Sequence, residues 1–255
     1  MTPSTNDKYV GIEIECMSIK DEDQVWELIE HHNLADYVDL DEDGSIEPTR
    51  ENFPCSECRG TGEQDMDDSE EGYSSVCHHC DGSGITHDVN GHELKVLAKQ
   101  SEVKVILGRV KYLLRDMDAK VNDSCGLHVH LDMRNRPIVD SANKLLNMQH
   151  LMLKSVPKHR RQNTYCRPVK KNEHTDVTKI SKYHVVHTED CLVNKNTIEV
   201  RVHEGTVDTD AIYKWVKFLV STVDGKYATA PRRTVRALPV RIKKYMQERM
   251  RMAGA

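Results

Sequence analysis

The stretch Val10-Gly11-Ile12-Glu13-Ile14-Glu15 alternates apolar residues with glycine or glutamate. A β-strand sends successive side chains to opposite faces, so Ile12 and Ile14 point one way while Glu13 and Glu15 point the other. The two carboxylates are then about 7 Å apart and, if partly shielded from water, repel each other by roughly 2 kcal/mol. A bound divalent cation removes that penalty.

Two later stretches show the same alternation, Leu127-His128-Val129-His130-Leu131-Asp132 and Ile198-Glu199-Val200-Arg201-Val202-His203. If the three strands share a sheet, one face is core and the other gathers carboxylates, imidazoles and a guanidinium. The alternative is an ordinary solvated face, which antiparallel sheets commonly have. Solvated faces favour Thr, Lys, Ser and Tyr, which all three stretches avoid, so we expect the floor of an active site.

Composition limits the class of protein. The chain has 255 residues, 38% hydrophobic and 30% charged, with a formal charge of −5. It can bury a sizeable core as one large domain, or as one domain plus a small module. No apolar run approaches the ~18 residues of a membrane span, and the start, Met1 to Lys8, is polar. We therefore predict a cytoplasmic protein without a membrane partner.

Four of the eight cysteines form two CxxC pairs, Cys55-Ser-Glu-Cys58 and Cys77-His-His-Cys80, and each pair opens the repeat CxxCxGxG. Four thiolates at this spacing predict a closed, tetrahedral structural Zn²⁺ site, with glycines that let the backbone turn around the metal. The alternative is a pair of disulfides. The other cysteines, at positions 16, 125, 166 and 191, are isolated, and we expect them to be buried thiols.

This repeat resembles the zinc-binding repeat of DnaJ-type chaperones, with two copies instead of that family's usual four. The resemblance implies a metal-stapled hairpin, not chaperone activity. The acidic segment 63–71 between the pairs would repel nucleic acid, so a nucleic-acid partner is disfavoured. Removing residues 52–88 would join the flanking segments across a short loop. We therefore predict an inserted zinc-finger module at 52–88, within a domain formed by residues 1–51 and 89–255.

Helical periodicity predicts helices at 21–32, at 101–118 with Ser101 as cap, from Asp140 to Pro157, at 208–222, and after Pro239. The basic segment 159–167 reads as a loop, either a solvated linker or an anion-binding element. The predicted fold class is α+β, a mainly antiparallel sheet with helices on one face, plus the small inserted zinc module.

The residue types on the polar face are compatible with two classes of enzyme. His128, His130 and Asp132 could hold a metal-bound water for a hydrolase. That motif leaves the glutamates unexplained, whereas carboxylate ligands favour Mg²⁺ held together with substrate phosphates, and Arg201 suits a phosphate or a developing oxyanion. The sequence has no GxxxxGK[ST] loop, and no GxGxxG follows a strand, so P-loop and dinucleotide-binding folds are disfavoured.

Together, the motifs resemble the amidoligase family, whose order they follow over nearly all of the chain outside the zinc insertion. They are Gly11-Ile-Glu13-Ile-Glu15, Asp43-Gly44-Ser45, Gly91-His-Glu93-Leu94, Asn122-Asp-Ser-Cys125-Gly126-Leu-His128-Val-His130-Leu-Asp132 and Thr197-Ile-Glu199-Val-Arg201-Val-His203-Glu-Gly205-Thr206. The family is related to glutamine synthetase and glutamate-cysteine ligase. The resemblance implies a glutamine synthetase-like catalytic fold. It also implies that ATP phosphorylates a carboxylate, and that an amine then displaces phosphate to form an amide.

The resemblance also suggests a role for each matching residue. Glu13, Glu15, Glu199 and Arg201 would be catalytic, His130 and Arg201 would bind the cofactor ATP, and Glu13, Glu15, Glu93, His128 and Glu199 would bind Mg²⁺. Cys55, Cys58, Cys77 and Cys80 would hold the structural Zn²⁺, and Arg160 and Tyr165 would contact substrate.

Three hypotheses remain open. The first is an ATP- and Mg²⁺-dependent carboxylate-amine ligase acting on small-molecule or peptide carboxylate and amine substrates. The second is a metal-dependent hydrolase that uses His128 and His130. The third is a zinc-stapled, non-catalytic binding protein on a ligase scaffold. Because relatives of glutamine synthetase often assemble, a homo-oligomer also remains open.

Overall fold

The computed structural model describes residues 8–42, 44–47, 49, 53–65, 74–86, 89–170, 176–225 and 238–254. A six-stranded sheet with the order β2-β5-β1-β6-β8-β7 dominates it, and every neighbouring pair is antiparallel. Its strands are β1 (Tyr9–Ser18), β2 (Val38–Glu42), β5 (Asn90–Lys99), β6 (Gly126–Asp132), β7 (Val186–His187) and β8 (Thr197–Glu204). A separate pair is formed by β3 (Glu63–Asp65) and β4 (Ser74–Val76).

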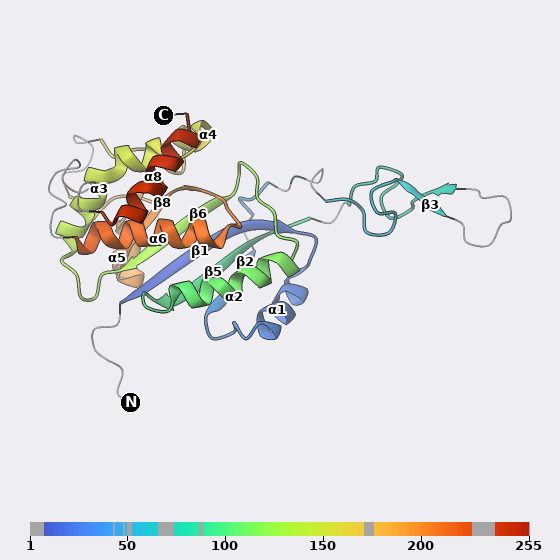
Figure 1. Ribbon diagram of the computed structural model, residues 1–255, viewed down its shortest axis with the longest axis horizontal. Coiled ribbons are helices and arrows are strands. Elements are labelled where there is room, and N and C mark those ends of the chain that lie inside the picture. Colours follow the sequence, from blue (N-terminus) through green and yellow to red (C-terminus); the bar gives the residue numbers. More distant parts are fainter. Residues whose placement is uncertain are drawn as a thin grey trace.

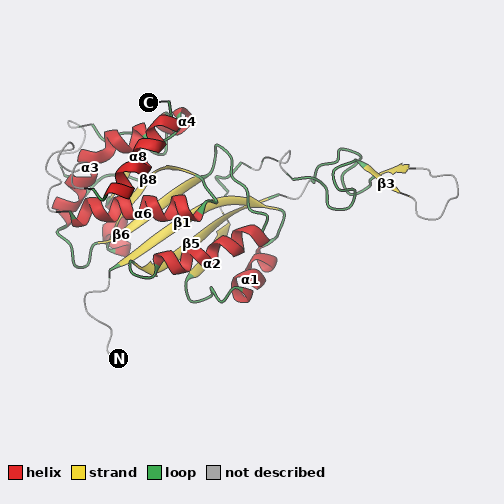
Figure 2. Ribbon diagram, viewed as in Figure 1, coloured by secondary structure: helices red, strands yellow, loops and turns green. Residues whose placement is uncertain are grey.

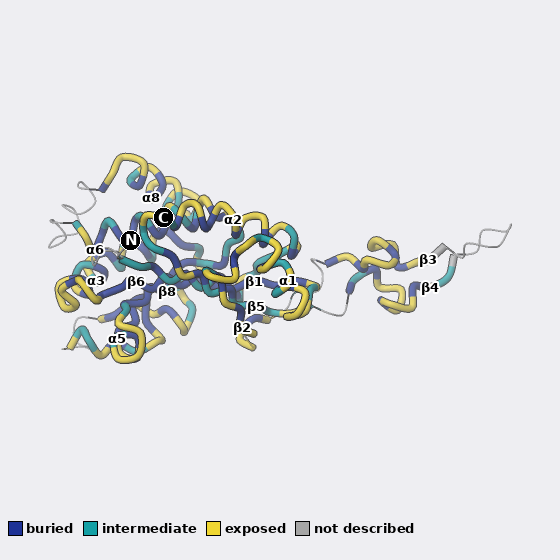
Figure 3. The backbone as a smooth tube through the Cα atoms, turned by 90° about the horizontal axis from the view of Figure 1, so that it is seen from below, coloured by how far each residue is buried: buried dark blue, intermediate teal, exposed yellow. Residues whose placement is uncertain are grey.

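Helices lie across one face of this sheet, as Figures 1 and 2 show for α2 and α6. The longer helices are α1 (Glu22–His31), α2 (Val103–Asp116), α3 (Ile138–Lys154), α6 (Thr209–Asp224) and α8 (Val240–Met252), and α4 (Lys158–Arg161) and α5 (Glu189–Lys195) are short. In the view of Figure 3, α2 and α8 lie above the sheet and α5 lies below it. The predicted α+β fold is confirmed, with the longer helices packed on one face of the sheet and the short α5 on the other.

The alternation predicted for the central strands holds. Ile12 of β1 pairs with Val96 of β5 and with Val129 of β6, and all three side chains are buried. They join a cluster that includes the apolar stripes of α1, α2, α3, α6 and α8, with Trp215 among the largest fully buried side chains. Because residues paired across strands share a face, Glu13 and its partners lie on the face away from this core.

Two predicted helix starts are wrong. Helix α2 begins at Val103 after Glu102, with no side-chain cap, so Ser101 is not its cap. Helix α3 begins at Ile138 after Pro137, which places Asp140 in the first turn instead of at the cap. Proline is well suited to a helix start, because its fixed φ is close to the helical value and the N–H it lacks would have no partner there. The helix after Pro239 is present as α8.

The cysteine-bearing segment projects from the rest of the molecule in Figure 1. At its root, Phe53 packs with Met17, Ile46 and Cys125, and Lys120 lies 4.4 Å from the centre of the Phe53 ring. The division into residues 1–51 with 89–255 and 52–88 stays a prediction. The described residues do not include 66–73, which contain most of the acidic segment, or the boundary positions 51, 52, 87 and 88, or Asp43.

No helix among the described residues combines the length and apolar character needed to cross a membrane.

The prediction that His203 lies on the polar face is wrong. The pairing of β6 with β8 shifts register between Leu127 and Val129, so Leu127 pairs with His203 while Val129 pairs with Val200. Such a bulge reverses the facing of the residues beyond it. His203 therefore shares the core face with Leu127, with its ring 4.9 Å from that of Trp215 and its Nε2 3.4 Å from the Tyr245 hydroxyl.

Burial lowers the pKa of His203 from 6.5 to about 4, which predicts a pH-dependent stability. Between these values the unfolded chain binds a proton that the folded protein does not bind, so stability is lost as the pH falls through this range. Between pH 7 and pH 5, we expect wild type to lose about 2 kcal/mol more unfolding free energy than His203→Gln. Urea unfolding at both pH values measures this difference.

The matched control is His150→Gln, which changes an exposed histidine of α3. It should keep the wild-type pH dependence. Equal losses in His203→Gln and wild type would contradict a neutral, buried His203.

Candidate functional site

Glu13 lies at the centre of the polar face because β1 is flanked by β5 and β6. It is directly opposite His128 in the register of β6. Its Oε2 lies 3.2 Å from His128 Nδ1, and its Oε1 lies 2.9 Å from His130 Nε2. Lys195, at the end of α5, approaches the same Oε1 at 3.6 Å. One carboxylate thus contacts both histidines of the HxH stretch.

Glu15, the second carboxylate of β1, contacts the start of β6. Its Oε1 lies 3.3 Å from His128 Nε2, and its Oε2 accepts a hydrogen bond from the backbone N–H of Gly126. His128 is therefore held between the two glutamates of the ExE stretch. A side chain at position 126 would occupy this space, which explains why a glycine fits there.

Glu199 enters the cluster from β8, opposite His130. Its Oε1 forms an ion pair with Arg201 and lies 3.6 Å from His128 Nδ1. Its Oε2 lies 2.8 Å from Nδ1 of His187, on the neighbouring edge strand β7. Both carboxylate oxygens are thus engaged, and they face different groups.

The cluster is buried, with Glu199 only 2% and His128 4% exposed. Burial alone would raise the pKa of Glu13, but hydrogen bonds and charge from His128 and His130 outweigh it and hold that pKa well below its usual range. Burial opposes ionisation of Glu199 too, yet His187, His128 and Arg201 lower its pKa to about 2. An ordinary solvated face is excluded, because these carboxylates pair with histidines and are largely shielded from water.

Asp132 does not join the two histidines. Arg134 binds it through two hydrogen bonds, from Nε to Oδ1 at 2.9 Å and from a terminal nitrogen to Oδ2 at 2.8 Å. The backbone N–H of Tyr9 also donates to Oδ2, at 3.3 Å. An HxHxD metal site would need this carboxylate free, so the arrangement weakens the hydrolase hypothesis.

Glu93 pairs with Glu15 across β5 and β1, so it lies beside the cluster. Burial and the charge of Glu13 raise the pKa of Glu93 to about 6, against the opposing effect of Lys95. Within the part of the chain that the structure describes, the groups close enough to share one ion do not contain Glu93 or Glu15. Both glutamates therefore lie beside the residues that are close enough to share one metal ion, but are not among them.

The basic segment 159–167 is partly helical. Arg160 belongs to α4 and is only 3% exposed, and its guanidinium donates to the main-chain oxygens of Arg201 and His203 at 3.1 Å. Arg160 therefore anchors β8 from beneath the site, and the solvated-linker interpretation fails for it. Tyr165 is 56% exposed, and its ring lies 6.1 Å from that of Tyr183.

Two clefts open on the polar face, and Glu13 lines both. One of about 390 Å³ has a lining that includes Tyr9, Leu97, His130, Arg134, Lys195 and Thr197. The other, of about 730 Å³, includes Glu47, Glu93, His128, Tyr165, Lys182 and Arg201 in its lining. His130 thus lines the smaller cleft, and His128 lines the larger one. The two histidines lie on the same face of the sheet, on opposite sides of Glu13.

The sequence analysis did not predict that His187 belongs to the site, or that Cys191 lies next to it. Cys191 Sγ lies 3.2 Å from His187 Nδ1 and 3.5 Å from Glu199 Oε2, so a thiol and a third imidazole belong to the cluster. The two residues are four apart, across the start of α5, and that spacing was the available signal. The four isolated cysteines are buried free thiols, as predicted.

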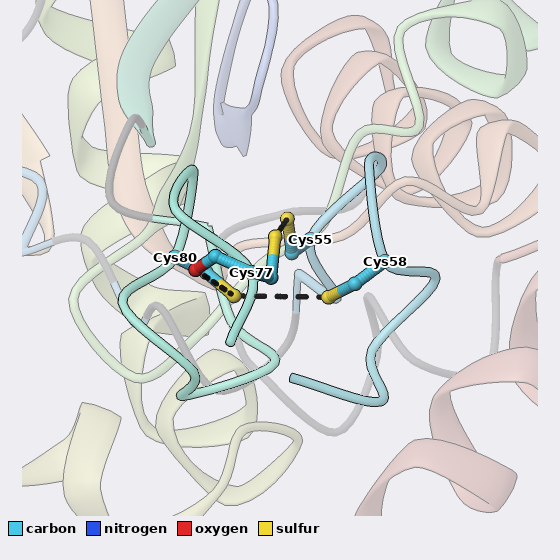
Figure 4. A group of neighbouring side chains, drawn as sticks. All are labelled: Cys55, Cys58, Cys77 and Cys80. Atoms are coloured by element: carbon cyan, nitrogen blue, oxygen red, sulfur yellow. Dashed lines mark hydrogen bonds between the residues drawn. The ribbon is translucent and has the colours of Figure 1, made fainter. Parts of the chain in front are cut away.

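The four cysteines of the repeat converge on one point, as Figure 4 shows. Their sulfurs lie within 4.8 Å of one another, with Cys55 to Cys77 at 3.9 Å and Cys58 to Cys80 at 3.7 Å. Zn–S bonds of about 2.3 Å imply sulfur separations of roughly 3.8 Å in a tetrahedral site. The sulfurs are too far apart for disulfides, whose S–S length is about 2.04 Å, so the cluster fits a zinc ion.

Comparison with known proteins adds one finding. Residues 96–175 match the model of a family described as "Putative amidoligase enzyme". The segment carries His128, His130, Arg160 and Tyr165, and the match supports an enzyme of the ligase class. It spans less than half of the chain and contains neither Glu13 nor Glu199. A comparison with curated proteins found no match.

The packing around Gly126 predicts a sensitive position. In Gly126→Ala, the added Cβ would clash with the Arg160 guanidinium and would lie 3.0 Å from His128 Nε2 and 3.2 Å from Glu15 Oε2. Because these groups are held in place by their own hydrogen bonds and ion pairs, we expect a loss of about 1–3 kcal/mol in unfolding free energy. Gly108→Ala is the control, since a Cβ on this α2 glycine meets nothing within 4 Å, and it should stabilise by about 1 kcal/mol. Chemical denaturation measures both, and a neutral Gly126→Ala would contradict the packing described.

Proposed function

We propose that this protein is an ATP-dependent carboxylate-amine ligase. The observation that carries the proposal is the buried cluster of ionised glutamates and histidines at the junction of two clefts. A ligase of this type must bring a nucleotide and an acid together on either side of one metal-bearing centre. The family match over residues 96–175 supports the same class.

The metal-binding residues in this proposal are Glu13, His128 and Glu199, whose donor atoms lie within 4.8 Å of one another. Two carboxylates and one imidazole suit a hard divalent ion such as Mg²⁺, which commonly completes its coordination with water and phosphate oxygens. Glu15 holds His128 from the opposite ring nitrogen. When bound, Mg²⁺ would neutralise charge that develops on the transferred phosphoryl group.

The nucleotide fits the cleft of about 390 Å³, and the acid and amine fit the larger one of about 730 Å³. The smaller cleft offers Tyr9 and Leu97 as apolar surface and Lys195 as a cation, with His130 directed toward phosphate. The larger cleft offers Arg201 near the metal-binding residues and Tyr165 at its exposed rim. Glu13, common to both clefts, marks where the two substrates meet.

In the proposed reaction, a carboxylate oxygen of the acid attacks the γ-phosphorus, and the bond to ADP breaks. The amine nitrogen then attacks the carbonyl carbon of the acyl phosphate, and inorganic phosphate leaves as the amine loses a proton. Arg201 is placed to bind the transferred phosphoryl oxygens, while buried Arg160 keeps the backbone of Arg201 in place. The chain acts by positioning and charge neutralisation, which suffice for phosphoryl transfer.

Calorimetric titration with MgATP tests the proposal without knowledge of the other substrates. We expect wild type to bind MgATP, and Glu199→Gln and Glu13→Gln to bind it at least ~10-fold more weakly, equivalent to about 1.4 kcal/mol. The reason is the loss of a charged metal ligand. Both variants should also fail to form ADP when acids and amines are screened.

The control is Glu27→Gln, which changes an exposed residue of α1 and should bind MgATP like wild type. If folded wild type binds no MgATP, either alone or with candidate acids, the ligase proposal fails. A non-catalytic, zinc-stapled binding protein then becomes the better interpretation.

We also propose that the four-cysteine cluster holds a structural Zn²⁺ ion. The segment around it is too small for a core of its own, so metal binding should contribute on the order of 10 kcal/mol to its folding. Four thiolates leave no open coordination position, which disfavours a catalytic role.

Removal of zinc by a chelator should unfold residues 53–65 and 74–86 and leave the six-stranded sheet intact. Hydrogen exchange followed by mass spectrometry should show lost protection in segments 55–62 and 77–84, with β1 and β6 unchanged. Cys55→Ser should reproduce this pattern, and Cys16→Ala should not. Simultaneous loss of protection in β1 would contradict an independently folding module.

A further inference from the structure

His187, Cys191 and Glu199 bring an imidazole, a thiol and a carboxylate to one buried point beside the proposed Mg²⁺ residues. The separations are 3.2 Å from His187 Nδ1 to Cys191 Sγ, 3.5 Å from Cys191 Sγ to Glu199 Oε2, and 2.8 Å from His187 Nδ1 to Glu199 Oε2. The three residues come from β7, α5 and β8 and are each at most 5% exposed. We propose that they form a second metal site, selective for a thiolate-binding divalent transition ion such as Zn²⁺, Fe²⁺ or Co²⁺.

The distances suit such an ion. Bonds of about 2.0–2.1 Å to nitrogen or oxygen and about 2.3 Å to sulfur imply donor separations of roughly 3.3–3.6 Å around a tetrahedral ion. The sulfur-containing pairs belong at the upper end of this range, so the separation from Cys191 to Glu199 agrees with it, and the separation from Cys191 to His187 must open by about a third of an ångström. The separation between His187 and Glu199 is that of a hydrogen bond, and it must open by about half an ångström to admit the ion.

The chemistry of the ligand atoms determines which metal ion each site prefers. Thiolate is a soft ligand and imidazole a borderline one, whereas Mg²⁺ binds oxygen and dehydrates reluctantly. The group Glu13, His128 and Glu199 is richer in carboxylates and suits the hard ion. The two positions therefore differ in chemistry although they are adjacent.

Glu199 is shared between the two positions. Its Oε1 faces His128 and Arg201, while its Oε2 faces His187 and Cys191. A carboxylate that presents one oxygen to each side is placed to bridge two ions, an arrangement found in two-metal sites. The proposal of a second metal site rests on this geometry and does not depend on the ligase function.

His130 lies beside the proposed ligands, where a tetrahedral ion would have its fourth coordination position. One of its ring nitrogens lies within 4.8 Å of the donor atoms of both Cys191 and Glu199. Its Nδ1 is also 3.1 Å from the Thr197 hydroxyl, a contact that orients the ring. Residues 194–197, at the end of α5 and the start of β8, line the cleft of about 390 Å³ together with His130. Three protein ligands with one open position are typical of catalytic metal sites.

Cobalt absorption spectroscopy tests the site in the full chain. The protein is first loaded with one equivalent of Zn²⁺, which occupies the four-cysteine cluster and resists Co²⁺ because zinc binds such sites more tightly. Co²⁺ is then titrated in the presence of excess Mg²⁺. We expect one further equivalent to bind with a thiolate-to-cobalt charge-transfer band in the near ultraviolet, whether or not the protein turns over ATP.

Cys191→Ser should abolish the band, and His187→Ala should weaken Co²⁺ binding at least ~10-fold. Cys16→Ala is the matched control, because it removes a buried thiol on the core side of β1, and it should retain the band. Circular dichroism of each variant establishes that it is folded. A folded wild type that shows no band, or an undiminished band in Cys191→Ser, overturns the proposal and leaves His187 and Cys191 as hydrogen-bonding neighbours of Glu199.

Discussion

Burying the ionised carboxylates of Glu13 and Glu199 is the constraint on which the rest of the site depends. A buried charge is costly unless it is paired, and here the partners are His128, His130, His187 and Arg201. The three histidines come from strands next to the one that carries their glutamate, and Arg201 comes from β8 itself, two residues after Glu199. The central position of β1 and the antiparallel order of its neighbours therefore bring these partners close enough to stabilise the buried charges. The helices packed on the other face hold the strands in this order.

The two clefts follow from the same geometry. Because Glu13 lies in the middle strand, the space on either side of it stays separate, and His130 faces one cleft while His128 faces the other. A shared carboxylate between two compartments suits a reaction in which a phosphoryl group passes from one substrate to another. Asp132 and Arg160 also line the clefts, but each is bound to groups of the protein itself.

The cysteine cluster, in contrast, is formed by local turns of the chain. Its four sulfurs are brought together by local turns of two similar repeats, in which the N–H groups of Gly62 and Gly84 donate to Cys58 and Cys80 at 3.3 Å. Little of the sheet is needed for that arrangement. The segment is nevertheless anchored by Phe53, which packs with Ile46 and Cys125. Their chain neighbours Glu47 and Ser124 line the larger cleft, so the anchor lies near the site where substrates are proposed to bind.

Sequence alone determined which residues of β1 and β6 face the site, because the period of a strand fixes alternate side chains to opposite faces. It likewise determined the four-cysteine cluster, whose ligands lie in short local repeats. Only the tertiary structure decided that a bulge sends His203 into the core, that Arg134 claims Asp132, and that His187 and Cys191 approach Glu199. The first and last outcomes depend on register between strands and on contacts between segments, which the spacing of residues within one strand does not encode. The Arg134–Asp132 contact is local, but it forms only because the chain turns just after β6.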